Sequence, residues 1–581
     1  MKGKQLLTDF IKKHKWSYIT GLIILIATTM INMTIPKLLG IITDGLNNKN
    51  MPQQQMVRYV LLMLGVAVAV FVFRFLWRYL LIGNCRSVEV YLRDNLFKHM
   101  QTLPVSFYSD NKTGNLVAYA INDVQAVRLV FGVGSIQILN GLLSSVISIV
   151  FMAKTIDPGL TLIALAPMPV AVLIMVTVGR LIRERFKKVQ EAFAAISEKV
   201  QENIAGIRVI KAFAQEKEEV DNFMKISRRR VDTQMKLTKV SALLGPCAQI
   251  CFGVGFLFFI VYGSRQVIEG EITLGDYVAF NSYMTIIMGP IMMISRIIDV
   301  WQRGIASYKR LREIFDTPSA AGRNSGETDI SGVKWNLEVK NLNFTYPGAA
   351  RRALKNINFK LENGKTLGII GRTGSGKTTL VNLLLKLYDV DDGHIFFDRT
   401  DINNIPTDVL RESIGYVPQD NFLFSTTIKN NIEFFRTVYS DYEIEQAARM
   451  SGVYDNIVSF PEGFSTVVGE RGVTLSGGQK QRISIARALV KNPGMLIMDD
   501  SLSAVDTKTE EEILDNIREL LRSKTGILIS HRVSTVKHAD EILFMDSGKI
   551  VERGTHEQLI KLGGHYYNLF RAQTDEEVEA V

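Results

Sequence analysis

Long apolar runs in the N-terminal half constrain the fold of this chain more than any other feature. Each run is near the length that a helix needs to cross about 30 Å of hydrocarbon. A backbone inside a bilayer must satisfy its own hydrogen bonds, so such runs predict membrane-spanning helices. Six runs qualify: residues 18–42, 57–82, 130–153, 160–182, 240–262 and 274–298. The first is too long for a signal peptide, so we expect a retained helix that is kinked at Pro36.

Basic residues are distributed unevenly between the predicted loops. The formal charge of +10 would by itself be compatible with nucleic-acid binding. The short loops hold one basic residue each, Lys49, Lys154 and Arg265. The two long loops hold many: Arg86, Arg93, Lys98, Arg180, Arg183, Arg185, Lys187, Lys188, Arg228, Arg229 and Arg230. The positive-inside rule therefore predicts that the long loops and both termini are cytoplasmic, and it explains the charge without nucleic acid.

The two long loops have the composition of helices. Residues 180–239 contain no proline, and apolar residues recur there at helical spacing. We therefore expect the fourth and fifth spans to continue into the cytosol as helices, and residues 86–103 to do the same. Each pair turns at a distal segment, near residues 107–114 and 212–223. We interpret these turns as docking points for a cytoplasmic domain, with plain hairpin tips as the alternative.

The composition changes at residues 317–334, which are rich in small residues and indicate a linker. Beyond it, short β-rich runs alternate with helical ones, a pattern typical of a largely parallel sheet covered by helices. The expected strands are residues 337–344, 365–370, 395–397, 414–417, 495–499, 526–529 and 541–545. We expect an all-α membrane domain over residues 1–316, an α/β domain over 335–574 and a solvated, unordered acidic tail over 575–581.

A phosphate-binding motif lies in the α/β part. From Gly371 to Thr378 the sequence fits the pattern G-x-x-x-x-G-K-[ST]. Its glycines let backbone N–H groups surround a triphosphate, and the following helix presents its positive end to the anion. Lys377 is predicted to reach the β- and γ-phosphates, and Thr378 to bind Mg²⁺ through its hydroxyl. The predicted nucleotide contacts are Gly371, Arg372, Thr373, Gly374, Ser375, Gly376, Lys377, Thr378 and Thr379.

Two further segments complete a nucleotide site of this class. Asp499 ends the apolar run 495–499, where a carboxylate is expected to hold Mg²⁺. A second anion-binding element opens a helix and consists of Ser476, Gly477, Gly478 and Gln479. A Ser-Gly-Gly turn alone is common, but its place between the phosphate loop and Asp499 makes the combination specific.

These motifs, in this order, resemble those of the ATP-binding cassette (ABC) transporters, specifically bacterial exporters with six spans ahead of one cassette. The resemblance covers essentially the whole chain. It implies that Gln419 links Mg²⁺ and the attacking water to the membrane domain, that His531 contacts the γ-phosphate and that Tyr346 stacks on adenine. It also matches residues 503–506 to a loop that communicates across a dimer, and residues 469–472 to a segment that touches the distal turns.

The resemblance implies an exporter-type (type IV) ABC fold, with a six-helix transmembrane domain followed by an α/β nucleotide-binding domain. It places the chain in the bacterial cytoplasmic membrane, with the N-terminus and the cassette in the cytoplasm. ATP and Mg²⁺ are the implied ligands, and a second half-transporter is the implied partner. Two cassettes would close head to tail, so that Ser476 of one faces the phosphate loop of the other. ATP would close the cassettes, the distal turns would move the spans, and hydrolysis would reset them.

One position departs from the family pattern. The family usually places a glutamate after the magnesium aspartate to polarise the attacking water, whereas this chain has Asp500. The shorter side chain holds its carboxylate about 1.5 Å away from the glutamate position, and a misplacement of that order can lower a rate about a hundredfold. We therefore expect catalysis by Asp500, Gln419 and His531 to be slow. Because segment 476–479 is intact, we expect a heterodimer; a homodimer with aspartate in both sites is the alternative.

The spans indicate the substrate class only in outline. Flexible thioethers and aromatic rings suit a pocket for varied apolar molecules, with packing in the core or against lipid as the alternative. The residues concerned are Met284, Met288, Met292, Met293, Phe252, Phe256 and Phe259. We expect ATP-driven export of hydrophobic or amphipathic small molecules. A lipid exporter and a mainly regulatory subunit that clamps ATP are the alternatives, and the spans argue against a soluble cassette ATPase acting on nucleic acid.

Overall fold

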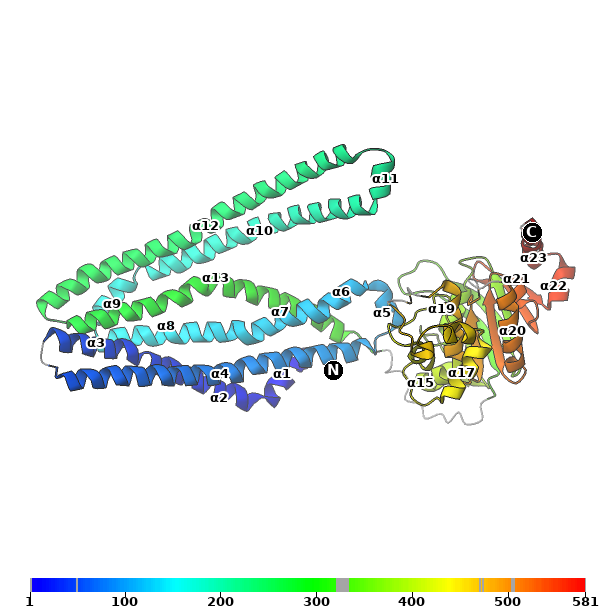
Figure 1. The fold of residues 1–581 in the computed structure, drawn as a ribbon, viewed down its shortest axis with the longest axis horizontal. Coiled ribbons are helices and arrows are strands. Elements are labelled where there is room, and N and C mark those ends of the chain that lie inside the picture. The colour runs from blue at the N-terminus through cyan, green and yellow to red at the C-terminus, as the bar shows by residue number, and fades with distance from the viewer. Residues whose placement is uncertain are drawn as a thin grey trace. The chain divides into compact units, whose positions relative to one another are not determined.

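The computed structural model describes residues 3–48, 51–319, 334–469, 472, 475–502 and 507–579. The chain divides into two compact units. One is formed by Met1–Gln101 and Thr113–Thr317, and the other by Thr102–Lys112 and Pro318–Val581. We call them the helical unit and the α/β unit (Figure 1). Most of the predicted linker, residues 317–334, lies outside the described residues.

The described regular structure of the helical unit consists of helices. They are α1 (Gly3–Lys13), α2 (Lys15–Asn32), α3 (Thr34–Asn47), α4 (Gln53–Met100), α6 (Thr113–Ala118), α7 (Val124–Leu129), α8 (Ser135–Thr155), α9 (Pro158–Leu165), α10 (Met168–Ala205), α11 (Ile207–Ala212), α12 (Glu216–Glu269) and α13 (Leu274–Asp316). Two π-helical turns, η1 (Tyr119–Asp123) and η2 (Val130–Gly134), connect α6, α7 and α8.

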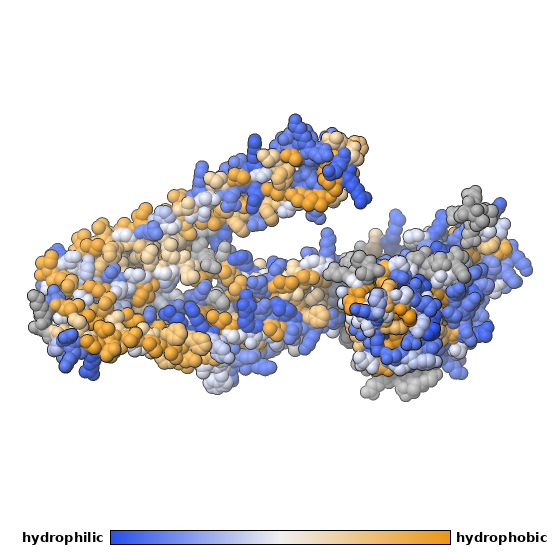
Figure 2. Space-filling model, in the orientation of Figure 1, coloured by the Kyte–Doolittle hydropathy of each residue, from blue (hydrophilic) through white to orange (hydrophobic). Residues whose placement is uncertain are grey.

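Five stretches of the described chain are long and apolar enough to cross a membrane, judged by length and composition. They are Lys15–Asn47, Gln53–Met100, Thr113–Thr155, Pro158–Ala205 and Glu216–Glu269. The sixth predicted span lies within α13, which is not among these five. Hydrophobic side chains cover much of the helical unit (Figure 2). Leu61, Leu64 and Phe71 of α4 are 60%, 62% and 71% exposed, as expected of side chains that face lipid.

The first predicted span is broken before Pro36. α2 ends at Asn32 and α3 begins at Thr34, since proline cannot continue the helical hydrogen-bond ladder. The hydroxyl of Tyr283 in α13 donates to the carbonyl of Met33, between the two helices, at 2.8 Å, and both residues are buried. The predicted kink is confirmed, and a neighbouring helix satisfies a carbonyl at the break, as a membrane interior requires.

The fourth and fifth predicted spans continue as long helices. α10 has 38 residues and α12 has 54, and they run side by side, joined by α11 (Figure 1). Near α11, Lys199 of α10 pairs with Glu219 of α12 at 2.8 Å. The predicted helical extension is confirmed. The turn itself is shorter than expected, because α12 already begins at Glu216.

The α/β unit contains two sheets. The six-stranded sheet has the order β10-β9-β3-β8-β7-β6, and its neighbours are parallel except for β9 and β10. Its strands are β3 (Thr366–Gly371), β6 (Ile414–Val417), β7 (Met495–Asp499), β8 (Thr525–Ser530), β9 (Glu541–Asp546) and β10 (Lys549–Gly554). The antiparallel four-stranded sheet has the order β2-β1-β4-β5, with β1 (Leu337–Phe344), β2 (Leu354–Leu361), β4 (Ile395–Phe397) and β5 (Thr400–Asp401).

The α/β unit also contains helices. They are α5 (Val105–Asp110), α14 (Lys377–Leu384), α15 (Thr407–Ser413), α16 (Ile428–Glu433), α17 (Asp441–Met450), α18 (Tyr454–Val458), α19 (Gly477–Leu489), α20 (Thr507–Leu521), α21 (Val533–Val536), α22 (His556–Leu562) and α23 (His565–Glu579). Because α23 extends to Glu579, the expectation of an unordered acidic tail is wrong for residues 575–579. No proline or glycine interrupts that stretch, so the helix continues through it.

Parallel pairing brings four strand ends to one edge of the larger sheet. Ile370 of β3 lies opposite Ser530 of β8, and Asp499 of β7 lies opposite Ile529. Val417 of β6 pairs with Met498. The segments that follow these strands carry most of the predicted site residues. In open α/β sheets, ligands bind at this carboxyl edge.

Candidate functional site

The loop between β3 and α14 needs glycine at specific positions. Gly374 and Gly376 have φ angles of +80° and +102°, which side-chain-bearing L residues rarely adopt. A Cβ atom on Gly376 would lie 2.8 Å from Cδ2 of Leu354 and 3.0 Å from the carbonyl oxygen of Ala353. Gly376 is also the N-cap of α14, so the free N–H groups of that helix start at the loop. The loop therefore offers a concave set of backbone donors that suits a phosphate.

Lys377 is folded back onto this loop. Its ammonium donates to the carbonyls of Gly371 at 2.8 Å and Arg372 at 3.0 Å, and the residue is 6% exposed. Burial lowers the pKa of Lys377, while the charges of Asp499 and Asp500 oppose that shift. A phosphate held in the loop would add negative charge and favour the ammonium form.

Asp499 lies beside the loop at the end of β7. It is 1% exposed, and Thr378 forms a side-chain hydrogen bond with it. Burial raises the pKa of Asp499, opposed by the hydrogen bond from Thr378 and by Lys377, while Asp500 raises it further. Among the described residues, Oδ2 of Asp499 and Oγ of Ser375 are buried without a hydrogen-bond partner. Oxygen donors of this kind, next to a cationic phosphate loop, fit a hydrated Mg²⁺ bound with a nucleotide.

Asp500 and His531 follow neighbouring strands and are in contact. The N–H of Asp500 donates to the carbonyl of Ile529 at 2.8 Å, and the N–H of His531 donates to Oδ1 of Asp500 at 3.4 Å. Burial lowers the pKa of the His531 imidazole, and Lys377 lowers it further; Asp500 and the backbone of Gly371 oppose the shift. The imidazole therefore lies close to both the phosphate loop and Asp500.

Two other predicted residues lie on different segments of the α/β unit. Gln419 follows β6 and its side chain is exposed. The hydroxyl of Tyr346 donates to Oγ1 of Thr379 in α14 at 3.0 Å. Its ring makes edge contacts with Phe344 and Tyr388, with centroids 5.1 and 5.0 Å apart. These contacts hold the Tyr346 ring beside the start of α14; its contact with adenine stays a prediction.

Residues 476–479 begin α19 and hydrogen-bond within their own helix. The N–H of Gln479 donates to Oγ of Ser476 at 3.3 Å, and the N–H of Ser476 donates to Oε1 of Gln479 at 3.0 Å, which is a capping box. Gly477 and Gly478 form the first turn. In the described part of the chain, no hydrogen bond connects residues 476–479 with residues 371–379. Residues 503–506, Glu470 and Arg471 lie outside the described residues.

Two residues that hold the His531 segment were not predicted from the sequence. Glu510 of α20 is 2% exposed and pairs with Arg532 at 2.9 Å. Gln573 of α23 is 42 positions from His531 and hydrogen-bonds to its carbonyl. Their contacts depend on tertiary packing, and no local spacing or turn motif indicates them.

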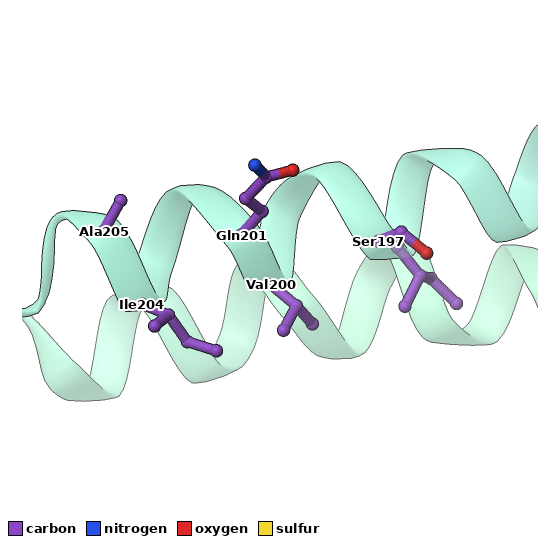
Figure 3. A pocket seen from close by; sticks show the side chains of 6 residues that line it. Ser197, Val200, Gln201, Ile204 and Ala205 are labelled. Atoms are coloured by element: carbon purple, nitrogen blue, oxygen red, sulfur yellow. The ribbon is translucent and has the colours of Figure 1, made fainter. Parts of the chain in front are cut away.

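Several of the aromatic and methionine side chains that suit a substrate pocket are buried within the helical unit. Phe259 is fully buried and stacks on Tyr277 and Phe280, with centroids 4.4 and 4.9 Å apart, and Phe252 and Met284 belong to the same buried cluster. These side chains pack in the core, as the alternative interpretation held. Figure 3 shows a depression along α10, which is lined by Ile196, Ser197, Val200, Gln201, Ile204 and Ala205 and holds none of the predicted site residues.

Known proteins resemble this chain along most of its length. The family model described as "ABC transporter transmembrane region" matches residues 18–291, and the one described as "ABC transporter" matches residues 354–503. The "Probable multidrug resistance ABC transporter ATP-binding/permease protein YheI" of Bacillus subtilis (strain 168) is 38% identical, covering 97% of this chain and 96% of that protein. The "Multidrug resistance-like ATP-binding protein MdlA" of Escherichia coli (strain K12) is 36% identical, covering 97% and 95%.

A solved structure shares the fold. It is a bacterial Atm1-family ABC exporter with ATP bound, at 24% identity and a TM-score of 0.78, and the match covers 97% of this chain and 99% of that one.

Proposed function

Because the chain belongs to the ABC transporter family, we propose that it uses ATP to export hydrophobic or amphipathic compounds as one subunit of a heterodimer. Both relatives named above are described as multidrug resistance or multidrug resistance-like proteins, which supports this substrate class. We place the chain in the bacterial cytoplasmic membrane. The distribution of its basic residues supports an orientation with the N-terminus and the α/β unit on the cytoplasmic side.

We assign the binding of ATP to the carboxyl edge of the larger sheet. The N–H groups of residues 371–379 and the ammonium of Lys377 would bind the phosphates, and Tyr346 would contact adenine. Thr378, Asp499 and Gln419 would hold Mg²⁺, which supplies positive charge next to the phosphates when it is bound. The buried oxygens of Asp499 and Ser375 that lack partners in the described chain support this assignment.

The single observation that carries the heterodimer proposal is Asp500. A water-activating carboxylate must reach the water beside the γ-phosphate, and the aspartate side chain is one methylene shorter than the family glutamate. Oδ1 of Asp500 also accepts a hydrogen bond from the backbone of His531. We propose that this site binds ATP and hydrolyses it slowly, because the carboxylate is short and its oxygen is engaged.

Residues 476–479 would serve the nucleotide of the partner subunit. Ser476, Gly477, Gly478 and Gln479 form the N-terminus of α19, and among the described residues they make no hydrogen bond to the phosphate loop of the same chain. A head-to-tail arrangement of two α/β units would use both elements. The partner would then carry the glutamate at the position of Asp500, and its site would provide most of the turnover.

Efflux from intact cells tests the proposal. The chain is expressed alone, and also together with half-transporters from the same genome that carry glutamate at the Asp500 position. We expect one pairing to extrude a hydrophobic dye and the chain alone to extrude none. Efflux by the chain alone would contradict the heterodimer and favour the homodimer. A pairing that hydrolyses ATP but moves only labelled lipid would favour the lipid exporter.

Variants in the two subunits, compared in one complex, show whether this chain mainly clamps ATP or also contributes to hydrolysis. If the chain mainly clamps ATP, replacing the partner's glutamate should abolish turnover, and Asp500→Asn in this chain should change it little. A large loss of turnover with Asp500→Asn would instead show that this site contributes to catalysis.

A further inference from the structure

An amide from the C-terminal helix fixes the backbone around His531. Nε2 of Gln573 donates to the carbonyl of His531 at 2.7 Å, and Oε1 of Gln573 accepts from the N–H of Val533 at 2.9 Å. The two bonds span Arg532, whose φ of −98° and ψ of 134° are extended. In an extended chain the carbonyl before a residue and the N–H after it point to the same side. The Gln573 amide therefore meets this segment as a neighbouring β-strand would.

Helix α23, which carries Gln573, is held in place at its N-terminal end. The first N–H groups of the helix, from His565 and Tyr566, donate to the carboxylate of Glu552. Tyr566 is fully buried, and its hydroxyl hydrogen-bonds to Nδ1 of His556 at 2.8 Å. A helix anchored by a buried aromatic and by hydrogen bonds at its start cannot shift easily. The position of Gln573 is therefore set by the α/β core.

A second group of contacts holds the same segment through side chains. Glu510 pairs with the guanidinium of Arg532 at 2.9 Å and accepts from the hydroxyl of Thr535 at 2.7 Å. These contacts fix Arg532 and the start of α21. Gln573 instead acts on the backbone of His531, which carries the imidazole next to the phosphate loop.

We propose that Gln573 is a positioning residue for ATP binding, which holds the His531 imidazole in place through the backbone on both sides of Arg532. The inference rests on the proposed function, because it assigns His531 to the γ-phosphate. ADP lacks that phosphate. Gln573 should therefore matter for the binding of ATP and much less for the binding of ADP.

Dissociation constants of MgATP and MgADP, measured on the purified full-length chain, test this. Gln573→Met keeps the length of the side chain and removes both hydrogen bonds, and Thr574→Ala removes a side-chain bond to Phe570 one position along the same helix. We expect Gln573→Met to weaken MgATP binding about tenfold and MgADP binding less than about twofold, and Thr574→Ala to change neither. A thermal unfolding midpoint without nucleotide is measured for each variant.

A double-mutant cycle separates positioning from general support of the fold. If Gln573 acts through His531, adding Gln573→Met to His531→Ala should weaken MgATP binding no further. Additive losses, equal losses for MgATP and MgADP, or unchanged MgATP binding in Gln573→Met would overturn the inference. A wild-type chain that binds neither nucleotide would overturn the proposed function, and the inference with it. If the wild-type chain binds both nucleotides, a negative result for Gln573→Met contradicts only the role given to Gln573.

Discussion

Asp500 determines what the candidate site can do at the scale of single residues. Its φ of +46° lies in the left-handed region, which aspartate tolerates because its short polar side chain can hydrogen-bond locally. The hydrogen bond that Oδ1 of Asp500 accepts here is a long-range one, from the backbone N–H of His531. A glutamate at the same position would carry its carboxylate one methylene farther from the backbone.

Asp500→Glu should therefore raise ATP hydrolysis by the purified chain, by up to about a hundredfold if the missing methylene is the main defect. The measurement is steady-state phosphate release at saturating MgATP. Asp500→Asn, which keeps the shape and removes the charge, is the matched control and should show no gain. If the glutamate variant is no faster than the wild type, other residues disable the site.

The pKa of His531 predicts a pH effect on stability. The folded pKa lies below the usual value of 6.5 because the imidazole is buried, so below about pH 6.5 the unfolded chain binds more protons here than the folded chain does. Stability should then fall as the pH falls. His538 shifts in the same direction, so the comparison is with His531→Gln. Between about pH 7.5 and about pH 5.5, the thermal midpoint of the wild type should fall more than that of the variant; equal falls would contradict the assignment.

The residues that could be predicted are those whose function requires a local pattern. Gly374, Gly376 and Lys377 form a loop that needs particular backbone angles at particular positions, so the motif is visible in the sequence. Gln573 contacts His531 across 42 positions. A single glutamine on a helix gives no local signal in the sequence, and only the packed structure shows its partner.

At the scale of elements, a half-buried arginine connects α19 with the segment that follows β6. Arg487 donates to the carbonyl of Asn431 at 2.7 Å, to the side chain of Asn431 at 3.0 Å and to the carbonyl of Phe422 at 3.0 Å. Burial lowers the pKa of Arg487 to about 10, so the guanidinium remains charged at neutral pH. The helix that begins at Ser476 is thereby attached to the chain that follows Gln419.

Arg487→Met should remove the guanidinium donor from the carbonyls of Asn431 and Phe422 and destabilise the α/β unit by about 2–4 kcal/mol. The thermal midpoint should fall by roughly 5–15 °C. Arg487→Lys keeps a charge but loses the planar fork, so it should recover only part of the loss. A midpoint unchanged in Arg487→Met would show that the connection does not contribute to stability.

The elements that escaped prediction share a physical cause. β5 has only two residues, and β2 and β10 mix polar and apolar residues, so none of the three gives a clear strand pattern in a single sequence. The long helices were easier, because a helical repeat without proline over residues 180–239 leaves few alternatives. The acidic composition of residues 575–579 indicates an unordered tail, but this stretch contains no proline or glycine that would end the helix.

At the scale of the whole molecule, the division into a membrane part and an ATP-binding part follows from composition and motifs alone. The two family models match these two parts of the chain, and the exporter fold agrees with them. Five stretches of the described chain have the length and composition of membrane helices, and α13, which contains the sixth predicted span, belongs to the same helical unit.

The most direct test of the account is the ATPase rate of the full-length chain purified alone, measured beside the complex with its glutamate-bearing partner. The chain alone should bind MgATP but release phosphate about a hundredfold more slowly than the complex. Turnover by the chain alone at a rate comparable to that of the complex would contradict the claim that its phosphate loop belongs to a weakly hydrolysing half of a shared site.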